Sequence, residues 1–329
     1  MKKNNNFFLI KTHLFKLIRL FLAFLLKKEY RFALSVRLTD RCQLSCVYCR
    51  KKHIKYDIDL DILIKFLKIF RKKGGFYVIL TGGEPFLYPH IEKLVRFLKE
   101  NKFYVAMNTN GQAIENPKYR NILKEMDEIV VSLDGPEKEN DKNRGSGTYK
   151  KIIKTIKYLY KNNKKIVLST VLTRNNLKSS TLEFFIKIKK RYGLIVDFGV
   201  VSPYIFGSVN KEMVLEETKQ KSFIKKILEF KQKYSIKELS KQILDYQKKP
   251  YKIRCIAPKY TIYVDVDGCV YPCIYGIGKP NMILGNIKNK DEFCYKNIYC
   301  DVCYCQSLLA LNLFSQKKNS IISFLRWIV

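Results

Sequence analysis

Acidic residues are scarce in this chain of 329 residues, where 29 aspartates and glutamates stand against 63 lysines and arginines. The formal net charge of +34 attracts anions of every kind, including nucleic acids, anionic lipid headgroups and acidic proteins. The sequence is also rich in Asn and Ile, so part of the lysine excess is expected to be compositional. The charge is therefore weak evidence for any one partner, and we do not expect the protein to bind nucleic acid.

Apolar runs long enough to cross a bilayer are missing from the sequence as well. The unbroken apolar stretch Leu20–Leu26 is too short to span a membrane, and no small-residue cleavage site marks a secretory signal. Charged residues at helical spacing predict an amphipathic helix over residues 1–30. Its apolar face could lie on an anionic membrane surface, which we slightly favour, or pack on the protein. An apolar C-terminal helix at 307–329, with Trp327, leaves the same two alternatives open.

Cysteine is absent between Cys49 and Cys255, and the ten cysteines form two groups on either side of this gap. Two groups suggest two metal sites rather than a disulfide lattice. The first group, Cys42, Cys46 and Cys49, has the spacing C-x3-C-x2-C. Three such thiolates can bind three corners of a cubic iron–sulfur cluster and leave its fourth iron open to chemistry. Zinc, which usually takes four ligands, or chance spacing is the alternative. Thiolate-bound iron predicts a reduced, cytoplasmic compartment.

A second motif, Thr-Gly-Gly-Glu-Pro at 81–85, follows the apolar run Phe76–Leu80, which predicts a buried strand. Glycines at the end of a strand allow a ligand to approach the backbone closely, and Glu84 offers a carboxylate to a cationic group. Alone, this motif is an ordinary strand–helix turn. A strand followed by C-x3-C-x2-C, then a helix, then a strand followed by Gly-Gly-Glu-Pro resembles the radical S-adenosylmethionine (radical SAM) enzymes. Tyr48, an aromatic residue before the third cysteine, fits the same family.

Predicted strands and helices alternate between Ala33 and Val201, which indicates parallel strands joined by crossover helices. The strands are expected at 33–39, 76–81, 103–108, 128–133, 165–172 and 195–201, and the helices at 58–73, 89–101, 116–125, 148–162 and 178–191. Six such units make an α/β fold, a partial (βα)6 TIM-like barrel, and the family resemblance implies the same. Chemistry in parallel barrels collects at the C-terminal ends of the strands, where each motif named here falls.

We expect five parts along the chain. They are an amphipathic N-terminal helix (1–30), a radical SAM core barrel (31–205), a helical connector (206–250), a cysteine-rich extension (251–306) and an apolar C-terminal helix (307–329). Within the extension, Asp267-Gly268 predicts the turn of a hairpin formed by Thr261–Val266 and Cys269–Tyr271.

The cysteines of the extension resemble the auxiliary-cluster extension of the family called SPASM, or its shorter twitch form. This resemblance implies one auxiliary 4Fe–4S cluster beside the SAM-binding one. Its expected ligands are Cys255, Cys273, Cys300 and Cys303, with Cys305 as a substitute for the last, and Cys269 and Cys294 are expected to be bystanders. Zinc is the open alternative, because four thiolates in pairs suit it well.

The family resemblance also implies the cofactor chemistry and residue roles. SAM chelates the open iron of the first cluster, and an electron passed to its sulfonium yields methionine and a 5′-deoxyadenosyl radical that abstracts hydrogen from substrate. The residues expected at SAM are Gly82, Gly83 and Glu84 at its amino group, Asn108 in the turn after the third strand, Ser132 and Arg144 at its carboxylate, and Asp134 at its ribose or the substrate. Each could equally cap a helix or form a surface pair.

Family members with such an extension often modify peptides or proteins, so a peptide or protein substrate is the first prediction, with a reducing electron donor such as flavodoxin or ferredoxin. The short segment before the barrel leads us to expect that a leader-peptide-reading domain is absent or lies on another polypeptide. Two alternatives stay open. One is an enzyme that modifies a lipid, isoprenoid or cofactor, held peripherally at the inner membrane surface. The other is a non-catalytic iron–sulfur or zinc scaffold, against which the intact motifs argue.

Overall fold

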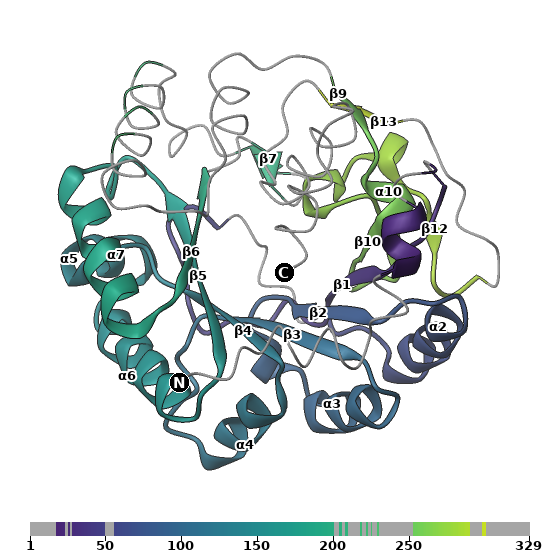
Figure 1. The fold of residues 1–329 in the computed structure, drawn as a ribbon, viewed down its shortest axis with the longest axis horizontal. Helices are drawn as coiled ribbons and strands as arrows, with labels where there is room; N and C mark the ends of the chain where they lie inside the picture. The colour runs from purple at the N-terminus through teal and green to yellow at the C-terminus, as the bar shows by residue number, and fades with distance from the viewer. Residues whose placement is uncertain are drawn as a thin grey trace.

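The structure is a computed structural model that describes residues 18–23, 26, 28–49, 56–200, 204–205, 208–209, 253–289 and 298–300, with the single positions 218, 222, 225 and 229. Most of the predicted connector, the predicted C-terminal helix, and Cys294, Cys303 and Cys305 lie outside the described residues. What is described is built around a curved nine-stranded sheet with helices along its outer face (Figure 1).

Six parallel strands alternate with helices through the core of this sheet. The strands are β1 (Ala33–Arg37), β2 (Tyr77–Thr81), β3 (Tyr104–Thr109), β4 (Glu128–Ser132), β5 (Lys165–Leu172) and β6 (Ile195–Val200), and the helices between them are α2 (Leu60–Lys72), α3 (Ile91–Glu100), α4 (Pro117–Glu125), α5 (Glu137–Arg144), α6 (Thr148–Lys161) and α7 (Ser179–Tyr192). Each strand pairs in parallel with the next, in chain order. The predicted partial barrel is confirmed, and the sequence missed only the short, highly charged helix α5.

Periodicity and caps explain why these segments form helices. In α2, the buried residues Leu60, Leu63, Leu67 and Phe70 recur at helical spacing. The carboxylate of Asp59 caps this helix by accepting a hydrogen bond of 2.9 Å from the backbone N–H of Ile62. Helix α4 begins with an asparagine cap and a proline in its first turn, a combination that suits the start of a helix.

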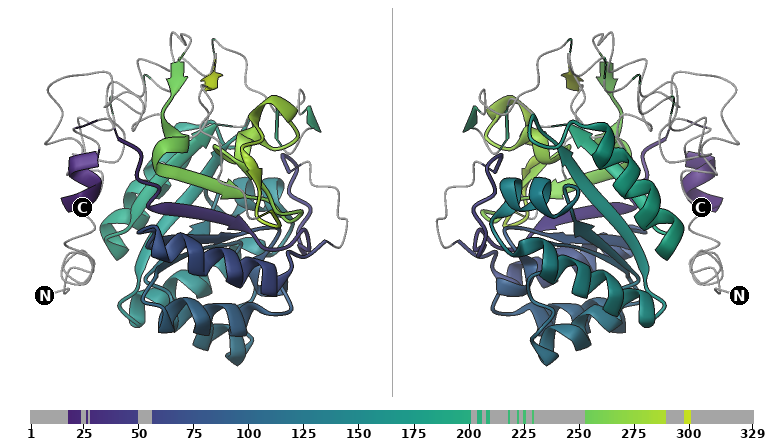
Figure 2. Two further views of the ribbon diagram at one scale, coloured as in Figure 1. Left: turned by 90° about the vertical axis from the view of Figure 1, so that its right-hand side faces the viewer. Right: turned by 90° about the vertical axis from the view of Figure 1, so that its left-hand side faces the viewer.

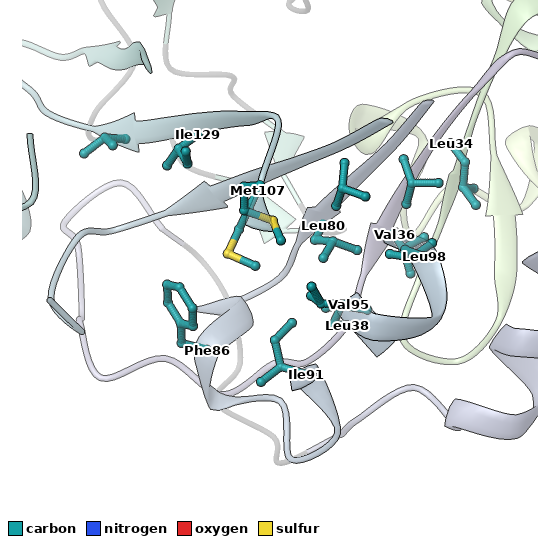
Figure 3. Packing of buried hydrophobic residues seen from close by; sticks show 14 of the residues in the cluster. Leu34, Val36, Leu38, Leu80, Phe86, Ile91, Val95, Leu98, Met107 and Ile129 are labelled. Atoms are coloured by element: carbon teal, nitrogen blue, oxygen red, sulfur yellow. The ribbon is translucent and has the colours of Figure 1, made fainter. Parts of the chain in front are cut away.

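The main hydrophobic core lies between the sheet and its outer helices. Val36, Leu80 and Met107 from successive strands pack against Ile91 and Leu98 of α3, and all five are almost completely buried (Figure 3). Because side chains alternate along a strand, the residues between these core positions point to the opposite, inner face of the sheet. The inner face is therefore available to residues that serve function rather than packing.

The cysteine-rich extension continues the barrel's own sheet. Strand β10 (Thr261–Val264) pairs in parallel with β1, and β11 (Cys269–Tyr271) pairs antiparallel with β10, so the predicted hairpin is confirmed (Figure 2). Strand β12 (Gly285–Asn286) adds a third antiparallel edge strand. The remaining short elements are β7 (Tyr204–Ile205), β8 (Ser208–Val209), β9 (Ile253–Cys255), α10 (Ala257–Tyr260), β13 (Ile298–Cys300), and the 3-10 turns η1 (Pro85–Leu87), η2 (Ile274–Gly276) and η3 (Pro280–Met282).

A buried triad of charges fastens this extension to the barrel. The guanidinium of Arg37, at the end of β1, lies 2.9 Å from Asp40 and 2.7 Å from Asp265, and all three residues are buried. Asp265 follows β10, and Asp40 precedes the first cysteine. Burial raises the pKa of Asp265, while the positive charge of Arg37 opposes this. One arginine therefore joins the strand, the cysteine loop and the hairpin.

The described part of the N-terminal segment packs on the protein. Residues 18–23 form a helical turn in which Leu20 and Ala23 are buried in a cluster with Phe32 and Phe76, whereas Leu22 is 50% exposed. For this turn the packing alternative holds, and contact with a membrane stays a prediction. Among the described residues, no helix combines the length and apolar character needed to cross a membrane.

Replacing Arg37 by methionine, which keeps most of the volume, should lower the free energy of unfolding by about 3–5 kcal/mol. The change removes the cation that two buried carboxylates share. Urea unfolding followed by circular dichroism measures this loss. Lys118→Met removes one partner of an exposed pair with Glu92 and should change stability by no more than about 1 kcal/mol. Equal effects of the two substitutions would contradict a structural role for the triad.

Candidate active site

The three cysteines Cys42, Cys46 and Cys49 lie on the loop that follows β1. Two backbone hydrogen bonds fix the start of this loop on the glycine turn after β2. The N–H of Gly83 donates to the carbonyl of Thr39 over 2.7 Å, and the N–H of Glu84 donates to the carbonyl of Arg41 over 2.8 Å. The two predicted motifs are therefore in direct contact.

The two glycines of the turn make this contact sterically feasible. A Cβ atom on Gly82 would lie 2.8 Å from the carbonyl oxygen of Thr39, and one on Gly83 would overlap the carbonyl of Arg41. The sequence suggested glycines that admit a ligand, whereas in the structure they admit the backbone of the cysteine loop. Their predicted contact with the amino group of SAM stays a prediction.

Glu84 ties the glycine turn to the end of β3. Its carboxylate is completely buried and accepts hydrogen bonds from the hydroxyl of Thr109 (2.9 Å) and the backbone N–H of Asn110 (2.8 Å). The side-chain amide of Asn110 then donates to the sulfur of Cys42 over 3.7 Å. Thr109 and Asn110 carry these contacts, while the predicted Asn108 is partly buried one position earlier on the strand. The role predicted for Glu84 at SAM stays untested.

Asp134 was predicted at the ribose of SAM or the substrate and Arg144 at the carboxylate of SAM. Both roles stay predictions, and in the structure the two residues bind each other. The Nη2 of Arg144 donates to Oδ1 of Asp134 over 3.0 Å, and its Nε lies 2.9 Å from Oδ2. The carboxylate also accepts hydrogen bonds from the hydroxyl of Tyr48 (2.9 Å) and the backbone N–H of Val171 (3.0 Å). Asp134 is completely buried. Its single carboxylate contacts the cysteine loop, α5 and β5.

The charge of Arg144 stabilises this junction. Burial on its own lowers the pKa of Arg144, but Asp134 more than offsets this and holds the pKa above its usual value. The guanidinium carbon also lies 5.6 Å from the centre of the Tyr48 ring, within cation–π range. In addition, the N–H of Val47 donates to the carbonyl of Asn143 over 2.9 Å. The second half of the cysteine loop is thus held on both sides.

The three thiols are chemically suited to an iron–sulfur cluster. All are partly buried cysteines, and a turn links Cys46 to Cys49 through a backbone hydrogen bond of 2.9 Å. Burial raises the pKa of the Cys46 thiol to about 11; Arg144 lowers it, and the neighbouring thiols Cys49 and Cys42 contribute to raising it. The sulfurs are therefore close enough to influence one another.

The same donor set is less suited to a single metal ion. Within the described ranges, no three His, Cys, Asp or Glu side chains converge closely enough to hold one ion. A cubic cluster needs less convergence, because each thiolate binds a different iron. Three thiolates on one locked loop therefore fit three corners of a 4Fe–4S cluster.

A row of polar side chains crosses the inner face of the sheet beyond this loop. The predicted Ser132 pairs in register with Ser169 of β5, which pairs in register with Asp197 of β6. Sequence analysis missed Ser169 and Asp197. An acidic residue inside the apolar run 194–200 was the available indication, because a buried carboxylate without a purpose is costly.

The second cysteine group is described in part. Cys255 is buried and Cys273 is partly buried. Strand β9, which ends at Cys255, pairs antiparallel with β13, which ends at Cys300. Two predicted ligands are therefore on adjacent strands, while the ligand roles of all five cysteines stay predictions. The sulfur of Cys269 accepts a hydrogen bond of 3.4 Å from Asn286.

A methyl group on Gly83 should displace the cysteine loop. We expect the Gly83→Ala protein, reconstituted anaerobically, to lose as much iron as Cys46→Ala loses, because the loop start is pushed off the turn. Gly199→Ala is the matched control, since its added methyl would lie 3.8 Å from the carbonyl oxygen of Thr170, an ordinary van der Waals distance. Iron analysis measures the effect, and a wild-type iron content in Gly83→Ala would contradict the steric argument.

The stability of the protein should fall with rising pH because of Asp197. Burial raises the pKa of Asp197 to about 6, above the unfolded value, so its protonated form stabilises the fold and this contribution is lost as the pH rises through 6. Asp197→Asn should therefore raise the free energy of unfolding by roughly 2–3 kcal/mol at pH 8, with the gain fading toward pH 4. Urea unfolding at both pH values tests this, and a pH-independent effect would refute it.

Comparison with known proteins identifies the domain that carries this site. Residues 36–185 match the Radical SAM superfamily. The mycofactocin maturase MftC of Mycobacterium tuberculosis is 29% identical over 167 residues, covering 49% of this chain and 42% of MftC. The chain spans less than two thirds of the length of several curated relatives that it matches.

Two solved structures share the fold. Streptococcus suis SuiB bound to precursor peptide SuiA has a TM-score of 0.65 at 18% identity, and the match covers 83% of this chain and 66% of the SuiB chain. The structure of anSMEcpe with bound AdoMet has a TM-score of 0.64 at 20% identity, and the match covers 79% of this chain and 78% of the anSMEcpe chain. The predicted radical SAM domain is confirmed, and with it the cofactor pair of a 4Fe–4S cluster and SAM. The two solved structures share the fold over most of this chain, while the SPASM- or twitch-like character of the extension stays a prediction. Residues 36–185 of this chain therefore carry a radical SAM domain.

Proposed function

We propose that this protein is a radical SAM enzyme that modifies a peptide or protein. The observation that carries the proposal is the cysteine loop, which the glycine turn after β2 holds at its start and which Asp134 holds through Tyr48 at its end. Such a loop offers three thiolates and leaves the fourth iron of a cubic cluster without a protein ligand. The radical SAM domain supports the reaction type, and the precursor peptide bound to SuiB, together with the name maturase for MftC, supports the substrate class.

The proposed role of the residues described here is to hold the cysteine loop in place. When bound, the cluster and SAM supply a 5′-deoxyadenosyl radical that abstracts hydrogen from substrate. Glu84, Thr109 and Asn110 hold the Cys42 side of the loop, and Asp134 with Arg144 holds the Tyr48 side. Ser132, at the end of β4 on the inner face, and Asn108 on β3 are proposed to contact SAM.

The extension is proposed to hold one auxiliary 4Fe–4S cluster. Cys255 and Cys300 on paired strands, with Cys273 after β11, support this assignment, and Cys303 or Cys305 would complete it. The extension shares the barrel's sheet, so the division near residue 251 separates roles rather than separately packed bodies. A positively charged surface favours an acidic electron donor of the flavodoxin or ferredoxin kind.

The lipid-modifying alternative receives less support. It rested on an apolar N-terminal face that would be free to lie on a membrane. In the described turn, Leu20 and Ala23 of this face are already buried against Phe32 and Phe76. A peripheral membrane contact of the intact chain is therefore a secondary proposal.

Anaerobic incubation of the reconstituted chain with SAM and dithionite should yield 5′-deoxyadenosine. Cys46→Ala should abolish the product because it removes one cluster ligand. Cys269→Ala, which changes a cysteine outside the proposed ligand sets, should retain it. Chromatography with mass spectrometry measures the product. Full iron content without 5′-deoxyadenosine in the wild type would instead favour the scaffold alternative.

The substrate class can be tested without knowing the substrate. Abstraction of substrate hydrogen transfers it to 5′-deoxyadenosine, so a deuterated substrate should leave deuterium in that product. We expect transfer from a peptide and protein fraction of cells grown on deuterated amino acids, and loss of transfer after protease digestion of that fraction. A deuterated lipid extract serves as the second arm. Transfer from the lipid extract alone would overturn the peptide assignment in favour of the lipid alternative.

A further inference from the structure

The polar row Ser132, Ser169 and Asp197 has a geometry suited to binding. The three residues occupy paired positions on the adjacent parallel strands β4, β5 and β6. Paired residues point to the same face of a sheet, and adjacent strands are about 4.8 Å apart. Their neighbours Val131, Leu168 and Val196 belong to the outer core, so the row itself points to the inner face.

Asp197 differs from the other sheltered carboxylates in the described part of the chain. Each of the others that is at least partly buried has an ion-pair or hydrogen-bond partner. These are Asp40, Asp57, Glu84, Asp127, Glu128, Asp134, Glu139, Asp141 and Asp265. Across the described ranges, no hydrogen bond or ion pair involves the side chain of Asp197, and the same is true of Ser132 and Ser169. Three polar groups therefore face inward, and the described part of the chain leaves their bonding capacity unused.

The described neighbours of the two serines on the same face of their own strands are apolar. Val167 and Val171 flank Ser169 on the same face of β5, and Val130 flanks Ser132 on β4. Burial raises the pKa of Asp197, and among the described residues no charged neighbour contributes to this shift. A carboxylate in such a wall is costly until a partner with positive charge compensates it. The wall is thus complementary to a cation with an apolar stem.

We propose that Asp197 and Ser169 form a subsite for a primary ammonium group of the substrate, a lysine side chain or an amino terminus, an inference that rests on the proposed peptide-modifying function. An ammonium seated between two neighbouring strands lies within hydrogen-bond reach of both side chains, and its three donors suit a carboxylate and a hydroxyl. Ser132, one strand further, stays assigned to SAM, so the subsite lies beside the proposed SAM contact. The valines accommodate the apolar stem.

SAM, which also carries positive charge, is the competing occupant. The contacts that hold the cysteine loop come from the turn after β2, the end of β3 and the segment from β4 to α5. Asp197 lies two strands beyond β4, about 10 Å along the sheet. The structure therefore assigns the subsite to the substrate rather than to SAM, and the affinity for SAM is measured as part of the test.

The test is calorimetric titration of the reconstituted, SAM-bound full-length protein with n-butylammonium, which mimics a lysine side chain, and with tetramethylammonium, which has no N–H donor. We expect saturable binding of n-butylammonium only. Its dissociation constant should rise about tenfold or more in Asp197→Asn and by a smaller factor in Ser169→Ala. Glu183→Gln, which changes an exposed carboxylate on α7, is the matched control and should bind like the wild type.

Three outcomes would overturn the inference. The first is equal n-butylammonium binding by the wild type and Asp197→Asn, and the second is no saturable binding by the wild type. The third is a tenfold loss of SAM affinity in Asp197→Asn, which would assign the carboxylate to SAM. Thermal unfolding of each variant verifies the fold. Formation of 5′-deoxyadenosine by the wild type reports separately on the proposed function, so failure of the subsite alone is distinguishable from failure of both.

Discussion

The contact on which the site depends is a backbone-to-backbone approach that only glycine permits. The start of the cysteine loop lies directly on Gly82 and Gly83, and two hydrogen bonds join the strands' ends there. Any side chain at Gly83 would occupy the position of the Arg41 carbonyl. Because β1 and β2 are fixed by the sheet, this contact sets where the loop begins and hence where its sulfurs lie. The motif Gly-Gly-Glu-Pro therefore has a structural role, because its glycines position the start of the cysteine loop.

Buried charge completes the arrangement. Asp134 collects donors from the cysteine loop, α5 and β5, and Arg37 joins β1 to the loop and to the extension. Breaking one partner of such a pair is costly, since it leaves the other in a medium that solvates it poorly. The two groups of cysteines are thus mechanically connected through Arg37. Among the described residues, Asp197 is the one sheltered carboxylate without such a partner, and the proposed substrate subsite rests on this difference.

Much of the fold was predictable from local pattern. Alternating apolar strands and amphipathic helices gave every strand of the barrel within a few residues, because their periods are written in the sequence. The motif spacing likewise predicted the cysteine loop and the glycine turn. Local pattern could not predict which side chains and strands contact one another in the folded protein. Asp134 bound to Arg144, and β10 paired beside β1, depend on tertiary contacts across many residues. The role proposed for Asp197 could not be predicted for the same reason. That no described residue pairs with its carboxylate is known only from the folded structure.

The central claim is that Cys42, Cys46 and Cys49 hold a 4Fe–4S cluster with one iron open to SAM. Electron–nuclear double resonance of the reduced protein, with SAM labelled isotopically at its amino nitrogen and carboxylate oxygens, tests it most directly. The account predicts hyperfine coupling between the cluster and both labels in the wild type, lost in Cys46→Ala. A reduced cluster without coupling to either label, or zinc in place of iron at these cysteines, would contradict it.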